Sequence, residues 1–318
     1  MSKLSGLRVI ELLNASGVYL GTTPETRDKV VRSSLGVVPR PRELDDYHLC
    51  GVYHKAGVEV ELEELLLDES ITAKDTAYLE LTRLVSDRVC QGLRDGKAVF
   101  VTGGTCVQAP GVAGGIRRAF GSTAKTGIIW LDAHGDLNIP ATSPSGMLGG
   151  MPFATILGYG LSEWRQSCGL DPAFEDRYAL LSDARSFDAT EMDNIRDREL
   201  TIVGTSAFND TDSWRLIAGR LAEQVDTLYL HIDADIVDSL YLPSVNTPEP
   251  DGPDIWTLME NIRIVMETGK VSVASLASVY FDAQGRGKER NAENQTAILS
   301  GIRMIASIIS NWQSWVKP

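Results

Sequence analysis

The sequence predicts an α/β fold built on one doubly wound, largely parallel sheet. Segments with strand-like and helix-like hydrophobic patterns alternate along all 318 residues, which is typical of repeated βαβ units. No stretch has the composition of a linker, so we expect a single domain over residues 1–318. Apolar residues make up 43% of the chain, which is sufficient for a substantial core.

The first half of the chain alternates strand-like segments with a helix. The strand-like segments are residues 7–13, 58–62, 98–102 and 128–131. A loop rich in Gly and Pro is expected between the first two, through residues 36–41. Residues 74–95 carry apolar side chains at i, i+3, i+4 and i+8 and are followed by Gly96, which predicts an amphipathic helix that ends there.

The second half continues the alternation. Its strand-like segments are residues 178–181, 200–204, 228–232 and 271–280. Helical apolar stripes fall within residues 214–225, 255–266 and 298–309. Pro253 suits the first turn of the second of these helices, because proline is favoured at that position.

Three potential metal ligands directly follow the strand at residues 128–131. Asp132, His134 and Asp136 stand at i, i+2 and i+4, so in an extended chain their side chains emerge on one side and can converge on one point. A solvated strand end that caps the next helix is the structural alternative for such a pattern standing alone.

A second apolar strand, at residues 228–232, ends on Asp233 and Asp235. Burying several carboxylates together is costly unless cations neutralise them, so two acidic strand ends in one chain favour a divalent metal site. Carboxylate and imidazole ligands without paired thiolates suit Mn²⁺ first, with Zn²⁺, Fe²⁺, Co²⁺ or Ni²⁺ as substitutes.

Three motifs in this chain resemble the ureohydrolase family of arginase, agmatinase and formiminoglutamase. They are residues 132–138, 231–238 and 247–252, and residues 103–106 take the place of the family's Gly-Gly-Asp-His motif. The resemblance implies a three-layer α/β/α domain with a central, mainly parallel sheet. It also implies a homo-oligomer, trimeric or hexameric, and the apolar Trp312 and Trp315 near the chain end agree with a subunit contact.

In this family two Mn²⁺ ions share a bridging hydroxide that attacks the planar carbon of a guanidinium or formimino group. The resemblance makes Asp132 and Asp233 bridging ligands, gives His134 and Asp235 to one metal, and gives Asp136 to the other. The candidate catalytic residues are Asp136, His231 and Ser278, and the candidate substrate-binding residues are Asn138, Ser145 and Thr247.

Two departures from the family pattern affect the metal site. Cys106 stands where the family has a histidine ligand. It is either a thiolate ligand that shifts the preference toward Zn²⁺ or Fe²⁺, or a small buried filler beside a weak or missing metal. His231 replaces a serine, and it is a supporting hydrogen-bond donor, a compensating ligand or an ordinary satisfied strand histidine.

Two more departures affect the substrate. Gly149 stands where arginases carry a histidine proton shuttle, and Ser278 replaces the acid that pairs with the guanidinium. Loss of that acid removes a charge-assisted bidentate partner, so we expect a substrate other than free arginine. The sequence therefore predicts a metal-dependent hydrolase of a non-peptide C–N bond in a small molecule. The alternative is a non-catalytic or single-metal relative that binds a small molecule or a protein.

Composition argues against several classes of partner and site. The formal net charge of −13 disfavours nucleic acid and anionic membranes. No apolar run is long enough to cross a membrane and the N-terminus lacks the apolar core of a signal peptide, so we expect a cytoplasmic protein. The four cysteines are widely spaced without a CxxC pattern, which argues against a disulfide framework or a zinc finger.

Overall fold

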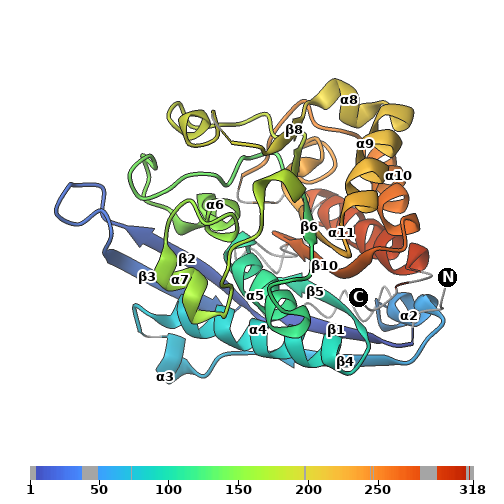
Figure 1. Ribbon diagram of the computed structural model, residues 1–318, viewed down its shortest axis with the longest axis horizontal. Coiled ribbons are helices and arrows are strands. Elements are labelled where there is room, and N and C mark those ends of the chain that lie inside the picture. The colour runs from blue at the N-terminus through green and yellow to red at the C-terminus, as the bar shows by residue number, and fades with distance from the viewer. Residues whose placement is uncertain are drawn as a thin grey trace.

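The centre of the molecule is an eight-stranded sheet with the strand order β4-β1-β5-β10-β9-β6-β7-β8, in which every neighbouring pair is parallel (Figure 1). In chain order the strands are β1 (Leu7–Leu12), β4 (Val60–Leu65), β5 (Ala98–Gly103), β6 (Thr126–Leu131), β7 (Ala179–Ser182), β8 (Thr201–Val203), β9 (Thr227–Asp233) and β10 (Val271–Ala277). The four inner strands β5, β6, β9 and β10 have almost entirely buried side chains, which explains their continuous apolar sequences.

The computed structural model describes residues 5–37, 49–72, 74–196, 198–243, 245, 247–279, 292–312 and 315. Residues 38–41 of the predicted loop, and Tyr280 at the end of the last predicted strand, lie outside this range.

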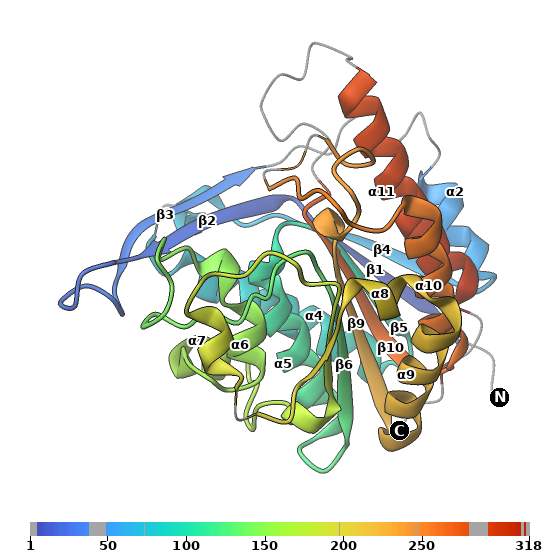
Figure 2. The same ribbon diagram turned by 90° about the horizontal axis from the view of Figure 1, so that it is seen from above.

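Helices cover both faces of the sheet, so the predicted three-layer α/β/α arrangement is confirmed (Figure 2). One face carries α4 (Ala77–Arg94), α5 (Ala109–Phe120), α6 (Pro152–Ile156) and α7 (Ser162–Ser167). The other carries α2 (Leu49–Tyr53), α8 (Thr205–Asn209), α9 (Thr211–Gln224), α10 (Ile255–Glu267) and α11 (Ala292–Asn311), and a short α3 (Glu69–Thr72) precedes α4. None of the helices in the described ranges is long and apolar enough to cross a membrane.

The region after β1 contains a hairpin that the sequence analysis missed. Strands β2 (Asn14–Leu20) and β3 (Val30–Val37) pair with each other in antiparallel fashion and project away from the main sheet (Figure 2). The prediction of a loop here was wrong because serines and glycines interrupt the strand pattern. The hairpin also holds the loop that follows β6, since the Leu20 amide donates to the Gly146 carbonyl at 2.6 Å.

Helix α5 was also missed, because its glycines resemble a loop sequence. Their function is close packing against α4: a Cβ on Gly111 would lie 2.4 Å from the Thr82 carbonyl oxygen, and one on Gly115 would lie 2.8 Å from that of Ser86. The glycines therefore permit two helices to approach closely, and tertiary packing outweighs their low helix propensity.

Two smaller expectations also need correction. Helix α10 is capped by Asp254, whose side chain accepts from the Thr257 amide, so Pro253 lies before the cap and not in the first turn. Trp312 and Trp315 are 1% and 4% exposed and pack inside the chain, so they do not argue for a subunit contact. The Trp312 indole donates to the Val271 carbonyl at 3.0 Å.

Candidate metal centre

The candidate site lies at the carboxyl ends of the inner strands β5, β10, β9 and β6. The two acidic strand ends are neighbours, because β6 pairs with β9 with Trp130 opposite His231. β10 adjoins β9 on its other side, with Ala277 opposite Asp233. The carboxyl edge of a parallel sheet, where the strand order departs from chain order, is the usual place for a ligand site in α/β proteins.

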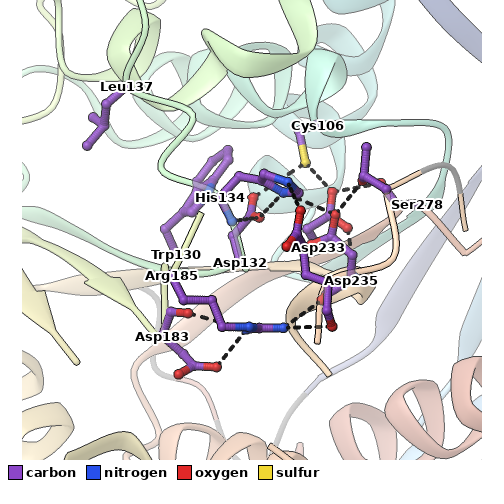
Figure 3. A network of polar contacts seen from close by, with 12 residues as sticks. Cys106, Trp130, Asp132, His134, Leu137, Asp183, Arg185, Asp233, Asp235 and Ser278 are labelled. Carbon is purple, nitrogen blue, oxygen red and sulfur yellow. Dashed lines mark hydrogen bonds and ion pairs between the residues drawn. The ribbon is translucent and has the colours of Figure 1, made fainter. Parts of the chain in front are cut away.

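Two groups of potential ligands form there and share one residue. Cys106, Asp132 and Asp136 make one group, and Asp132, His134 and Asp235 make the other. Figure 3 shows Cys106, Asp132, His134, Asp233 and Asp235 close together at this edge. Within each group the donor atoms all lie within 4.8 Å of one another. Asp132 is thus placed between two adjacent sites, which is the arrangement expected of a bridging carboxylate.

The predicted convergence of Asp132, His134 and Asp136 is achieved by a turn and not by an extended strand. β6 ends at Leu131, and Asp136 has a φ of 50°, in the left-handed region. The His134 amide donates to Asp132 Oδ1 at 2.7 Å, which closes the turn. The strand assumption was therefore wrong, although the residues do converge.

Asp233 lies beside the first group and contacts the sulfur of Cys106. Cys106 Sγ is 2.8 Å from Asp233 Oδ2, and the Ser278 hydroxyl donates to the same oxygen at 2.7 Å. Asp233 and His231 belong to neither ligand group as the described side chains are placed. The expectation that Asp233 bridges two metals thus stays a proposal.

Cys106 is almost fully buried at the cluster. Burial raises the pKa of its thiol well above the usual range, and the charges of Asp233, Asp136 and Asp132 raise it further. The thiol is therefore protonated while no cation is bound. A divalent cation would reverse this preference, since thiolates are the form that binds metals.

His231 is also fully buried, and its two nitrogens have different partners. Nε2 lies 3.3 Å from Cys106 Sγ, and Nδ1 lies 2.7 Å from the Ser275 hydroxyl. Its ring stacks on Trp130 with centroids 3.8 Å apart. Burial lowers the pKa of His231 to about 3, so the imidazole is neutral and Nε2 can accept from the thiol. This geometry supports the role of a partner to Cys106.

The pKa values of the other titratable groups in the cluster are raised, which favours their protonated forms. Burial raises the pKa values of Asp132, Asp136 and Asp235, and it raises that of Asp233 to about 6. Burial lowers the pKa of His134, but hydrogen bonds to Asp132 and Asp235 outweigh it and raise the value to about 12. So many acids in one buried cluster require neutralisation.

Two buried carboxylate oxygens in the cluster have no hydrogen-bond partner among the described residues. They are Asp136 Oδ2 and Asp235 Oδ1, and each belongs to a residue of a different ligand group. Buried oxygens without a partner are energetically costly. One such oxygen in each ligand group fits a pair of divalent cations. The residues present therefore suit the metals that the sequence predicts.

A cavity of about 510 Å³ opens onto this cluster. Its lining includes the predicted residues Asn138, Ser145, Gly149, Thr247 and Ser278. Four of these make polar contacts within the protein, and one is Ser145, whose hydroxyl oxygen accepts from the Met147 amide at 3.2 Å. Asn138 Nδ2 donates to Asp188 at 2.8 Å, Thr247 donates to Asp235 at 2.8 Å, and Ser278 donates to Asp233.

Several lining residues were not predicted. Asp188 and Glu191 follow β7, whose carboxyl end meets the same edge of the sheet, so the acids after that strand were a usable signal. Glu191 is buried and accepts from the Leu137 amide at 2.7 Å, which fixes the start of the loop after β6. Gly17 and Tyr19 come from the hairpin that the sequence did not predict.

Comparison with known proteins gives one consistent result. A family model of the arginase family matches residues 43–301. An arginase of Bacillus caldovelox is 31% identical over 175 residues, which is 54% of this chain and 58% of that protein. An arginase of Brevibacillus brevis is 31% identical over 240 residues, which is 68% of this chain and 77% of that protein. The crystal structure of an arginase from Bacillus cereus matches with a TM-score of 0.78 at 22% identity, over 96% of this chain and 98% of the other, which shows the shared fold.

Proposed function

The chain belongs to the arginase family of hydrolases, and we propose that it hydrolyses a non-peptide C–N bond with the help of two divalent cations. The substrate class is a guanidino, formimino or related linear amidine or amide compound other than free arginine. The observation that carries this proposal is the pair of ligand groups that share Asp132. The unpaired oxygens of Asp136 and Asp235 support it.

The chain offers each cation a distinct set of side chains. Cys106, Asp132 and Asp136 would hold one, and Asp132, His134 and Asp235 the other, with Asp233 beside them. When bound, two such cations supply a hydroxide nucleophile near neutral pH and stabilise the charge that develops on the attacked group. Mn²⁺ is the expected ion, and the sulfur of Cys106 makes Zn²⁺, Fe²⁺, Co²⁺ or Ni²⁺ a substitute.

The residues around the cluster determine which substrate can react. Ser278 has a neutral hydroxyl that already donates a hydrogen bond to Asp233. It therefore offers no carboxylate to a cationic guanidinium. Gly149 brings no titratable side chain to the cavity, so proton transfer by a histidine at this position is ruled out. The missing carboxylate at Ser278 favours a substrate whose reacting end is less dependent on charge pairing than that of arginine.

A second function has one specific observation in its favour. The Cys106 thiol lies between Asp233 and His231 at hydrogen-bonding distance. These hydrogen bonds satisfy the thiol within the protein, so Cys106 does not need a cation as a partner. On this view the protein is a single-metal or non-catalytic relative that binds a small molecule or a protein.

Metal analysis and a substrate screen distinguish the two functions. We expect two equivalents of metal per chain after reconstitution with Mn²⁺ or Zn²⁺, and release of ammonia or urea from at least one guanidino, ureido, formimino or amide compound. Arginine belongs in the same screen as the comparison substrate, and Asp132→Asn is the inactive control. One equivalent or none, together with no release from any compound, would favour the binding function. Light scattering of the same samples tests the proposed homo-oligomer, trimeric or hexameric.

A further inference from the structure

The two ring nitrogens of His134 point in opposite directions. Nδ1 faces the cluster, 3.2 Å from Asp235 Oδ2 and 3.5 Å from Asp132 Oδ1. Nε2 faces away from it and lies 3.2 Å from Glu249 Oε1. Only Nδ1 is therefore available to the ligand group that contains His134, and Glu249 is the partner of the other nitrogen.

We propose that Glu249 is a positioning residue for the metal centre. Its carboxylate accepts the hydrogen of Nε2 and so selects the tautomer of His134 in which the Nδ1 lone pair faces Asp132 and Asp235. Ligating histidines usually have such a carboxylate or carbonyl partner, which fixes the ring and increases its basicity. This inference rests on the proposed function, because it assumes that His134 holds a cation.

The backbone around the His134–Glu249 contact is held by one residue, Arg185, through its amide and its guanidinium, which supports a positioning role. The Arg185 amide donates to the Ala133 carbonyl at 2.9 Å, directly before His134. Its guanidinium donates to the Pro250 carbonyl at 2.8 Å, and it reaches the carbonyls of Glu249 and Asp235 at 3.3 and 3.4 Å. Arg185 therefore fixes both sides of the contact and one of the metal ligands.

Arg185 is itself held by a buried acid. Its Nη1 lies 2.9 Å from Oδ2 of Asp183, which is fully buried at the end of β7 (Figure 3). The segment of Glu249 has a further anchor in the Ser239 amide, which donates to the Glu249 carbonyl at 3.0 Å. A segment with these anchors presents the Glu249 carboxylate in a defined place, as a positioning role requires.

The competing explanation is an ordinary ion pair. The side chains of His134 and Glu249 are 29% and 26% exposed, and partly exposed pairs contribute little to stability. An ordinary pair would change the melting temperature slightly without affecting one metal site more than the other. A positioning role predicts instead that the loss of Glu249 weakens metal binding at the site of His134 and not at the other.

The test compares Glu249→Gln and Glu249→Ala with the control Asp251→Asn. The control removes an acid from the same segment at an exposed residue whose φ of 62° asparagine tolerates. Zn²⁺ binding is followed by competition with a chromophoric chelator. We expect Glu249→Ala to weaken one of two Zn²⁺ equilibria by roughly 10- to 100-fold. Glu249→Gln should lose less, because its amide oxygen still accepts from Nε2, and the control should bind like the unaltered protein.

Nitrogen-15 spectra of the imidazoles give a second readout that does not depend on affinity. The chain has 4 histidines, so His134 is assigned by comparison with His134→Asn. In the Zn²⁺-loaded protein we expect His134 to carry its proton on Nε2, and in Glu249→Ala this proton should exchange with solvent much faster. Circular dichroism confirms that each variant is folded.

Two outcomes overturn the inference, and they are distinguishable. If the unaltered protein binds two Zn²⁺ ions and folded Glu249→Ala binds both with unchanged affinity and the same Nε2–H signal, Glu249 is not a positioning residue and the proposed function stands. If the unaltered protein binds no Zn²⁺ or Mn²⁺, the proposed function fails and the inference fails with it.

Discussion

Asp132→Asn is the substitution whose effect on metal binding should be largest. Asp132 belongs to both ligand groups, whereas Asp136 and His134 each belong to one. Asparagine keeps the size of the side chain but has a single oxygen and no charge, so it serves neither cation well. We expect the variant to lose affinity at both sites, and Asp136→Asn or His134→Asn to lose it mainly at one.

The size of the effect follows from the stabilisation that bound metal confers. At a free concentration of 100 times Kd, each site adds about 2.7 kcal/mol to the free energy of unfolding. Unfolding of a chain this long has an entropy of roughly 0.7 kcal/mol/K, so one site raises Tm by about 4 °C and two sites by about 8 °C. Asp132→Asn should therefore abolish most of the metal-induced rise, and the two single-site variants should keep about half.

The assay is a melting curve of each variant with and without Mn²⁺, supported by elemental analysis of dialysed samples. The difference between the two curves matters, because Asp132 also accepts from the Trp130 indole at 3.0 Å and its replacement changes the metal-free Tm as well. The idea of a shared carboxylate would be refuted by an Asp132→Asn variant with the full rise, or with a loss no larger than that of Asp136→Asn.

Three further predictions concern pH, the thiol and a glycine. Burial raises the pKa of Asp233 from its usual value of 3.8 to about 6 in the folded metal-free protein, so the folded state binds this proton more tightly than the unfolded chain does. The contribution of this proton to stability is complete below the unfolded pKa and is lost as pH rises through the folded pKa. Protons also compete with the metal for Asp233, so the metal-induced rise in Tm should be larger at about pH 7 than at about pH 5. Cys106→His should raise Mn²⁺ affinity in a titration, because imidazole suits Mn²⁺ better than sulfur does; unchanged Mn²⁺ affinity in a folded Cys106→His variant would exclude this position as a ligand. Gly252→Ala should lower the free energy of unfolding by about 1–3 kcal/mol in urea, because its Cβ would lie 2.5 Å from the Ile236 carbonyl oxygen and 2.7 Å from the Asp238 amide nitrogen, and these backbone atoms cannot move aside easily. The control Gly219→Ala, whose Cβ meets no atom of the described chain within 4 Å, should not destabilise.

The central strands and their acidic ends could be predicted because each is recognisable from a short stretch of consecutive residues. β5, β6, β9 and β10 are buried on both faces, so they are continuous apolar sequences, and polar residues directly after them must lie at the sheet edge. The adjacency of Asp132 and Asp233 then follows from the parallel pairing of β6 with β9.

The parts that escaped prediction depend on contacts between distant segments. Gly111 and Gly115 are helical because α4 lies against them, and nothing within α5 itself signals this. Arg185 acts on backbone carbonyls of a segment more than sixty positions further along the chain, so neither its own neighbours nor those of Glu249 reveal it. The left-handed conformation of Asp136, with a φ of 50°, was likewise not predicted, because aspartate adopts it only uncommonly.

Three of the four departures from the family pattern fall on one side of the metal centre. In the sequence Cys106, His231 and Ser278 lie far apart, but in the structure Cys106 and Ser278 both contact Asp233 Oδ2, and His231 contacts Cys106. The other side keeps its oxygen and nitrogen donors, with His134 held between its ligand group and Glu249. Cys106 Sγ lies beside His231 Nε2 from β9 and Asp233 Oδ2, and this oxygen also accepts from Ser278, directly after β10. Because Cys106, His231, Asp233 and Ser278 form one network of contacts, we expect the affinity and metal preference of the Cys106 group to differ from those of the His134 group within the same cavity.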